Sequence, residues 1–188
     1  MTFVDRLAAA LATRSPVRVH RPEARNAAVA VVIAAETEPS IVFIKRKERV
    51  GDPWSGQMAF PGGFAAPGDG SLLTTARRET EEETGIVLEE GDLLGVLDDV
   101  SPRTPYLPPL VVTPYVFRVP GRLPASPGPE AEATVWLEVR DLFDPSRRRP
   151  FRLTLPRETR EFDSIVIGGY TIWGLTERVL DQMRRTAA

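Results

Sequence analysis

The segment between residues 62 and 86 reads GGFAAPGDGSLLTTARRETEEETGI and predicts a glycine turn that leads into a helix. Glu79, Glu82 and Glu83 stand at i, i+3 and i+4, so a helix carries their carboxylates on one face. Like charges at this spacing repel by about 0.2–0.5 kcal/mol per pair. A divalent cation would offset that repulsion, because Mg²⁺ and Mn²⁺ prefer oxygen ligands and leave coordination positions open for phosphate. The segment therefore predicts a metal site that meets a phosphate.

The rest of the chain predicts strands around this helix, which runs from Ser71 to Thr84 and stops at Gly85. A helix is expected over about residues 2–13, and an amphipathic helix from Trp173 to Arg184 with Trp173 in the core. Strands are expected at Ala27–Ala35, Ile41–Lys45, Leu93–Val100, Leu110–Val119, Thr134–Val139, Phe151–Leu155 and Ser164–Ile167. This order favours one α/β domain over residues 1–188, an α/β/α sandwich with a mixed β-sheet.

Composition excludes several classes of protein. The 188 residues have a formal net charge of -2, which gives no basic surface for long nucleic acid, although a small anionic ligand needs only a local cluster. The absence of cysteine excludes disulfides, thiolate zinc sites and thiol nucleophiles. No apolar run reaches the roughly 18–20 residues of a membrane span, and the first residues have helical spacing rather than that of a secretion signal. A cytoplasmic protein is expected.

The run from about residue 63 to 86 resembles the Nudix box. The family pattern is glycine, five residues, glutamate, seven residues, then R-E-U-x-E-E-x-G-U, where U is bulky and apolar. The second half matches as RETEEETGI from Arg78 to Ile86, with Thr80 at the first apolar position. The first half departs twice, because Asp69 replaces the glutamate and one extra residue precedes Arg78. The order and length of the motif favour this resemblance over a merely solvated charged helix face.

The resemblance implies hydrolysis of a nucleoside diphosphate linked to another moiety, with Mg²⁺ or Mn²⁺ as cofactor. By position, Glu79, Glu82 and Glu83 are the expected metal ligands, and Arg78 orients them through its planar fork. The glycines Gly62 and Gly63 are expected to let the backbone approach the site. In this family the base that accepts the proton of water lies either on the helix, which points to Glu82, or on a distant loop. The distant candidates here are Glu130 and Glu132, of which we favour Glu132.

Two further segments resemble the coenzyme A pyrophosphatase branch of the family. Upstream of the box, IVFIKRKERVGDPWSGQMAFPGG matches that branch at Arg46, Gly56 and the final FPGG, and the C-terminal YTIWGLTERVL resembles its IWG-x-T helix start. The branch's second arginine and histidine are replaced here by Arg49, shifted in register, and Trp54. Arg46, Arg49 and Trp54 are expected to bind coenzyme A through charge and stacking, and a solvated turn is the alternative.

Three functions follow from these patterns. The first is a metal-dependent pyrophosphohydrolase of coenzyme A or its derivatives, releasing 4′-phosphopantetheine and 3′,5′-ADP. The second is a Nudix hydrolase of another nucleotide, such as a dinucleotide, a nucleotide sugar or a nucleoside triphosphate. The third is a catalytically silent nucleotide-binding module, which the three glutamates of the helix disfavour. A small nucleotide is the expected partner, and binding to a membrane or to long nucleic acid is not expected. A homodimer is expected from the family alone.

Overall fold

A computed structural model of the chain describes residues 1–52, 54–102, 107–154 and 158–188. Its helices are α1 (Phe3–Thr13), α2 (Leu72–Thr84), α3 (Val139–Leu142) and α4 (Leu175–Thr186). Its strands are β1 (Arg25–Ala34), β2 (Ser40–Arg46), β3 (Met58–Ala59), β4 (Gly62–Phe64), β5 (Leu93–Val96), β6 (Leu110–Val119), β7 (Ala131–Glu138), β8 (Arg148–Thr154), β9 (Thr159–Ile167) and β10 (Tyr170–Trp173). Short 3-10 turns cover Glu90–Asp92 and Pro145–Arg147.

The main sheet is mixed and is built around β1. Strand β1 runs parallel to β6 and antiparallel to β2 and β4. The sheet continues through β2 to β3 and β7 and through β6 to β5. Strands β3 and β4 come from the MAFPGGF segment, which periodicity alone did not predict as strand. Their pairing with β2 and β1 brings the glycine pair against the centre of the sheet.

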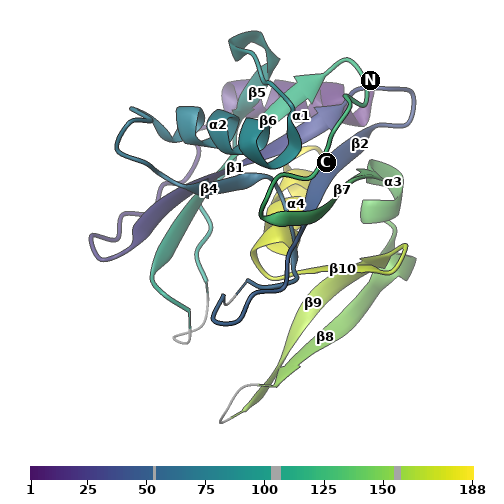
Figure 1. Cartoon of the computed structure of the whole chain (residues 1–188). Helices are drawn as coiled ribbons and strands as arrows, with labels where there is room; N and C mark the ends of the chain where they lie inside the picture. The colour runs from purple at the N-terminus through teal and green to yellow at the C-terminus, as the bar shows by residue number, and fades with distance from the viewer. Residues whose placement is uncertain (53, 103–106, 155–157) are drawn as a thin grey trace.

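Helices cover both faces of this sheet, as Figure 1 shows. Alternate residues of β1 enter two separate cores because side chains of a strand point to opposite faces. Val31 and Ile33 pack in the core shared with α1 and α4, whereas Val32 packs with Ala76 of α2 in the other core. The expected α/β/α arrangement with a mixed sheet is therefore confirmed.

A second sheet of three antiparallel strands, in the order β10-β9-β8, lies beside the main one. Strands β8 and β9 form a long hairpin that extends away from the body in Figure 1. Both strands are longer than expected from the sequence, and Leu155, the expected end of the first, lies outside the described residues. Both strands contain exposed stretches of charged residues, so the alternation of apolar and polar residues that predicts a strand was not evident over their full length.

The C-terminal helix begins later than expected. Trp173 is the last residue of β10, and Gly174 at φ 70 separates it from α4, which starts at Leu175. The prediction of a helix from Trp173 was wrong, because Ile172 and Trp173 follow the alternation of a strand before the glycine turns the chain. Trp173 is only partly buried, so its place in the core was wrong as well.

Other boundaries agree closely with expectation. Thr2 caps α1 in a capping box with Asp5, which fixes the start of the expected N-terminal helix. Strand β5 ends at Val96, earlier than expected, and only Val100 forms an isolated bridge beyond it. Within the described ranges, the structure has no helix with the length and apolar character to cross a membrane.

Candidate functional site

Helix α2 is fixed at both ends and on its buried face. The Ser71 side chain accepts a hydrogen bond from the Thr74 amide at the N-terminus, and Gly85 ends the helix in the left-handed conformation at φ 73. Ala76 and Thr80 are fully buried against the sheet, and the Thr80 hydroxyl donates to the carbonyl of Ala76 at 2.7 Å. The opposite face is thereby left to carry the acidic residues.

Arg78 holds the acidic face together. Its guanidinium donates to both carboxylate oxygens of Asp69, at 2.8 and 3.0 Å. It also contacts Glu79 at 2.9 Å and Glu82 at 3.2 Å. The expected orienting role of Arg78 therefore has a geometric basis, since one planar fork contacts three carboxylates.

Asp69 has a place in this network despite the extra residue before Arg78. Its carboxylate accepts hydrogen bonds from the Thr75 hydroxyl at 2.7 Å and the Ala66 amide at 2.9 Å, besides the pair from Arg78. These donors, Arg78 first, hold the pKa of Asp69 well below its ordinary value. The residue is buried. Asp69 thus connects the loop before α2 to Arg78, the arginine that contacts the glutamates.

Glu83 is the most deeply placed acid of the helix. Its side chain accepts a hydrogen bond from the Gly62 amide at 2.9 Å, and the residue is only 6% exposed. Burial first, with the nearby charges of Glu79 and Glu130, raises the pKa of Glu83 to about 7, although the Gly62 amide and the charge of Arg46 act to lower it. Burial likewise raises the pKa of Glu79. Two neighbouring acids whose charged forms are disfavoured form a position where a cation would be stabilising.

The glycine pair allows the close approach expected of it. A Cβ on Gly63 would lie 2.4 Å from the carboxyl carbon of Glu79, and a Cβ on Gly62 would lie 2.3 Å from the carbonyl oxygen of Ala28. No larger residue fits either position without movement of these neighbours. The absence of a side chain therefore sets how closely β4 lies to both the helix and β1.

A cavity of about 1000 Å³ opens beside the helix. Of the residues predicted for the site, it is lined by Arg46, Trp54, Gly62, Gly63, Glu79 and Glu83, and also by Glu130. Arg49, Arg78, Glu82 and Glu132 do not line it. The structure therefore brings two of the three helix glutamates to the cavity wall and leaves Glu82 at its margin, 58% exposed beside Arg78.

The two loop acids are placed differently. Glu132 lies on β7, is 56% exposed and pairs with Lys45 at 3.2 Å. Glu130 lies before β7, lines the cavity and pairs with Arg49 at 2.9 Å, and its carbonyl accepts from the Lys47 amide. Geometry therefore favours Glu130 over Glu132 as a group near the helix acids. Only the pairing of β2 with β7 distinguishes them, so the sequence carried no signal for the choice.

The loop that carries Glu130 is attached directly to the end of α2. The amides of Ser126 and Gly128 donate to the carbonyls of Thr84 and Glu83, each at 2.9 Å, and so satisfy carbonyls that a helix end leaves free. A Cβ on Gly128 would lie 2.2 Å from the carbonyl oxygen of Glu82. The position of Glu130 is thus tied to the backbone of the acidic helix, a contact that the sequence analysis missed.

The cavity offers carboxylate oxygens, the kind of donor that a divalent cation needs. Among the described residues, no three acidic or histidine side chains are gathered tightly enough to form a ready-made metal cage. The cavity is nevertheless acidic, because its described lining holds six carboxylates and three guanidinium groups. The acids are Glu79, Glu83, Glu130, Glu161, Asp163 and Glu177, and the cations are Arg46, Arg160 and Arg178. Because carboxylates outnumber guanidinium groups, the cavity suits a hard divalent cation. A polyanionic ligand would need such a cation to offset the negative charge of the lining.

Comparison with known proteins agrees with this geometry. A family model described as the NUDIX domain matches residues 24–157. The chain is 33% identical over 159 residues to the uncharacterized Nudix hydrolase NudL of Yersinia pestis strain Pestoides F, covering 83% of this chain and 76% of that protein. NudL of Yersinia pseudotuberculosis serotype O:1b matches with the same identity and coverage.

Solved structures show the same fold at low sequence identity. A MutT/nudix family protein from Enterococcus faecalis superposes with a TM-score of 0.63 at 20% identity, covering 98% of this chain and 69% of that one. The NUDIX domain of Shewanella oneidensis NrtR, in complex with ADP ribose, superposes with a TM-score of 0.61 at 15% identity over the full length of both chains. These likenesses concern the arrangement of the backbone.

Replacing Gly128 by alanine is expected to lower activity more than stability. The added Cβ meets the backbone at Glu82, so the loop and Glu130 must move away from α2. We expect kcat to fall by about tenfold or more, because misplacement of about 1 Å can cost 10²-fold. Gly91→Ala is the matched control, since a Cβ there meets nothing within 4 Å. Equal kinetics for the two variants would contradict the role of Gly128.

Asp69→Asn is expected to loosen Arg78 and to cost about 10–100-fold in activity, as loss of a partner of a ligand-orienting group does. Because the folded-state pKa lies below the ordinary 3.8, the carboxylate stabilises the fold above that value and loses this contribution as pH falls through the folded pKa. The gap in melting temperature between wild type and variant should therefore be constant near neutrality and shrink below about pH 4. A gap independent of pH down to acid unfolding would count against this network.

Proposed function

The chain belongs to the Nudix family and is a hydrolase, and on that premise we propose that it is a metal-dependent pyrophosphohydrolase whose substrate is coenzyme A or a derivative. One observation carries the proposal: Glu79 and Glu83 of the box helix, Glu130 and Arg46 line a single large cavity. Acids that favour a cation and an arginine that favours a phosphate therefore face the same space.

Glu79 and Glu83 are the residues we assign first to the metal, with Glu82 joining them. Glu82 is exposed, and its carboxylate contacts the Arg78 guanidinium at 3.2 Å, a weak surface pair, so its side chain can rotate toward the cavity. Mg²⁺ or Mn²⁺ bound there would neutralise phosphate oxygens and activate water for attack at phosphorus. Arg78 and the Gly62 amide hold the glutamates in place before substrate arrives.

The proposed reaction breaks one phosphorus–oxygen bond of the diphosphate bridge. The oxygen of water bonds to one phosphorus and the bridging oxygen leaves with the other, while a carboxylate accepts a proton from the water. We assign that carboxylate to Glu130, because it lines the cavity and Glu132 does not. Arg49 pairs with the Glu130 carboxylate at 2.9 Å and so restrains its position.

Arg46 is the proposed phosphate contact. Its Nη2 donates to Asp52 at 2.8 Å, but its buried Nε has no hydrogen-bond partner among the residues that the structure describes. A buried unpaired donor is costly, and an anion in the cavity would satisfy it. Trp54 lines the same wall and offers a face for stacking. Arg49 lies outside the cavity, so its contribution is proposed to act through Glu130 rather than through substrate.

Another nucleotide remains the second candidate. The NrtR domain of similar fold is described in complex with ADP ribose, and the large cavity accepts a nucleotide conjugate of that size as well. A catalytically silent module is disfavoured because Glu79 and Glu83 both reach the cavity. The homodimer and the cytoplasmic location stay predictions.

A substrate panel tests the proposal. With Mg²⁺ or Mn²⁺, coenzyme A should be cleaved to 4′-phosphopantetheine and 3′,5′-ADP faster than ADP-ribose or NADH, with products identified by mass, and a chelator should abolish turnover. Glu82→Gln should reduce turnover by more than about a hundredfold without changing the fold. If coenzyme A is cleaved no faster than ADP-ribose or NADH, the substrate assignment fails, and unchanged turnover in the variant would remove Glu82 from the site.

The base is tested by a matched pair of substitutions. Glu130→Gln should lower kcat by about 10²-fold or more, because a general base contributes about 10²–10⁴-fold. Glu132→Gln should stay within about twofold of wild type, since it loses only an exposed ion pair with Lys45. If Glu132→Gln lowers kcat more than Glu130→Gln does, Glu132 rather than Glu130 is the base.

A further inference from the structure

A second, smaller cavity of about 490 Å³ adjoins the large one. Its lining residues are Lys45, Asp52, Ser55, Gly56, Gln57, Met58, Phe151, Leu153, Gly169, Tyr170, Thr171 and Trp173. Gln57, Leu153 and Trp173 line both cavities, so the two spaces share a wall. None of the helix acids reaches the smaller cavity. It is therefore a separate space next to the reaction site.

The shared wall is built around the Trp173 indole. Its ring stacks on Phe151, which lines only the small cavity, with centroids 4.4 Å apart. It also contacts Phe162, the cross-strand partner of Phe151, which lines only the large cavity, at 5.4 Å. Three aromatic rings thus fix the boundary between the two spaces, and aromatic pairs of this geometry stabilise one another.

A charged pair forms a second link between the cavities. Arg46, which lines the large cavity, pairs at 2.8 Å with Asp52, which lines the small one. The preceding strand residue, Lys45, faces the small cavity. A molecule whose phosphates meet Arg46 would therefore have a neighbouring space for whatever is attached to those phosphates.

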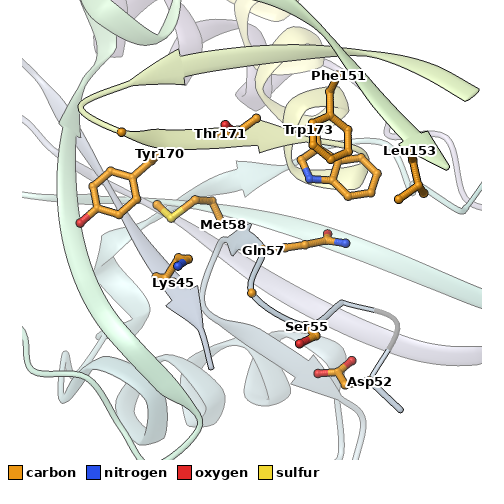
Figure 2. Close-up of a pocket in the computed structure, with 12 residues that line it drawn as sticks. Lys45, Asp52, Ser55, Gln57, Met58, Phe151, Leu153, Tyr170, Thr171 and Trp173 are labelled. Carbon is orange, nitrogen blue, oxygen red and sulfur yellow. The ribbon is translucent and has the colours of Figure 1, made fainter. Parts of the chain in front are cut away.

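The two sides of the small cavity differ in chemistry, as Figure 2 shows. Phe151, Leu153, Tyr170 and Trp173 come from the three-stranded sheet and give that side a mostly apolar surface. Across from them lie the polar groups Lys45, Asp52, Ser55 and Gln57, with Met58 of β3 between Lys45 and Gln57. The space fits a group with aliphatic surface and regularly placed hydrogen-bonding groups, such as an amide-bearing chain.

We propose that the small cavity is the subsite for the non-nucleotide moiety of the substrate, and that this moiety is an amide-bearing aliphatic chain rather than a sugar. The inference rests on the proposed function for the placement of the phosphates, since it assigns the nucleotide half to the large cavity. A sugar carries a hydroxyl group on most of its carbons, and those directed at the apolar side would be left unpaired.

The test measures binding of fragments without turnover. In chelator-treated buffer, 4′-phosphopantetheine and ribose 5-phosphate are titrated into the full chain by calorimetry. Thr171→Trp fills the small cavity and should weaken 4′-phosphopantetheine by about tenfold or more. Thr159→Trp is the matched control, because Thr159 is exposed on the same sheet and lines neither cavity; it should stay within about twofold. Ribose 5-phosphate should bind more weakly than the amide fragment.

Each outcome decides the inference separately from the activity. Equal binding of 4′-phosphopantetheine to wild type and Thr171→Trp, or no binding to wild type, overturns the subsite. Tighter binding of ribose 5-phosphate overturns the choice of chain over sugar. If Thr171→Trp does not fold, Tyr170→Ala, which removes one apolar wall, should weaken the amide fragment by about fivefold or more. Fragment binding without hydrolysis of any conjugate would contradict the proposed reaction and leave the subsite standing.

Discussion

The contact of one guanidinium with three carboxylates is the interaction on which the site depends. Three glutamates on one helix face repel one another, and burial of Glu83 adds the cost of desolvation. Arg78 offsets this by contacting Glu79 and Glu82 while Asp69 fixes Arg78 itself. The helix persists because its other face is packed against β1 and both ends are capped. Stability is thus supplied away from the acids, which remain available for a ligand.

Backbone approach, rather than side-chain contact, sets the distances around this helix. Gly62 reaches Glu83 with its amide, Gly63 leaves room for Glu79, and Gly128 contacts the last turn. In each case a methyl group would overlap with its neighbour. At Gly62 and Gly128 that neighbour is backbone, which cannot rotate away, and at Gly63 it is the carboxylate of Glu79. The glycine turn, the acidic helix and the loop bearing Glu130 therefore behave as one rigid assembly mounted on β1. Such rigidity is what positioning of reacting groups requires.

Features encoded by near neighbours could be predicted from the sequence. The bounds of α2, its acidic face and the stop at Gly85 depend on spacing within one helix, and they agree with the structure. The choice between Glu130 and Glu132 depends on the pairing of β2 with β7, which shifts at Lys45 and Arg46. A one-residue shift in register moves a side chain to the other face, and no local pattern reports it. The small cavity escaped prediction for the same reason, since it joins residues more than 100 positions apart.

The separation of the acidic helix from the second sheet has a physical consequence for substrate selectivity. The acids proposed to act on the substrate are held by hydrogen bonds within α2 and to its immediate neighbours, so substitutions on the second sheet should leave them undisturbed. In the proposed subsite, one wall for the rest of the substrate comes from β8, β9 and β10, a sheet with its own pairing and its own aromatic contacts. Changes there reshape the space beyond Trp173 without moving Glu79 or Glu83. Under the proposed function, the helix would determine which bond is broken, and the three-stranded sheet would determine which molecules present that bond.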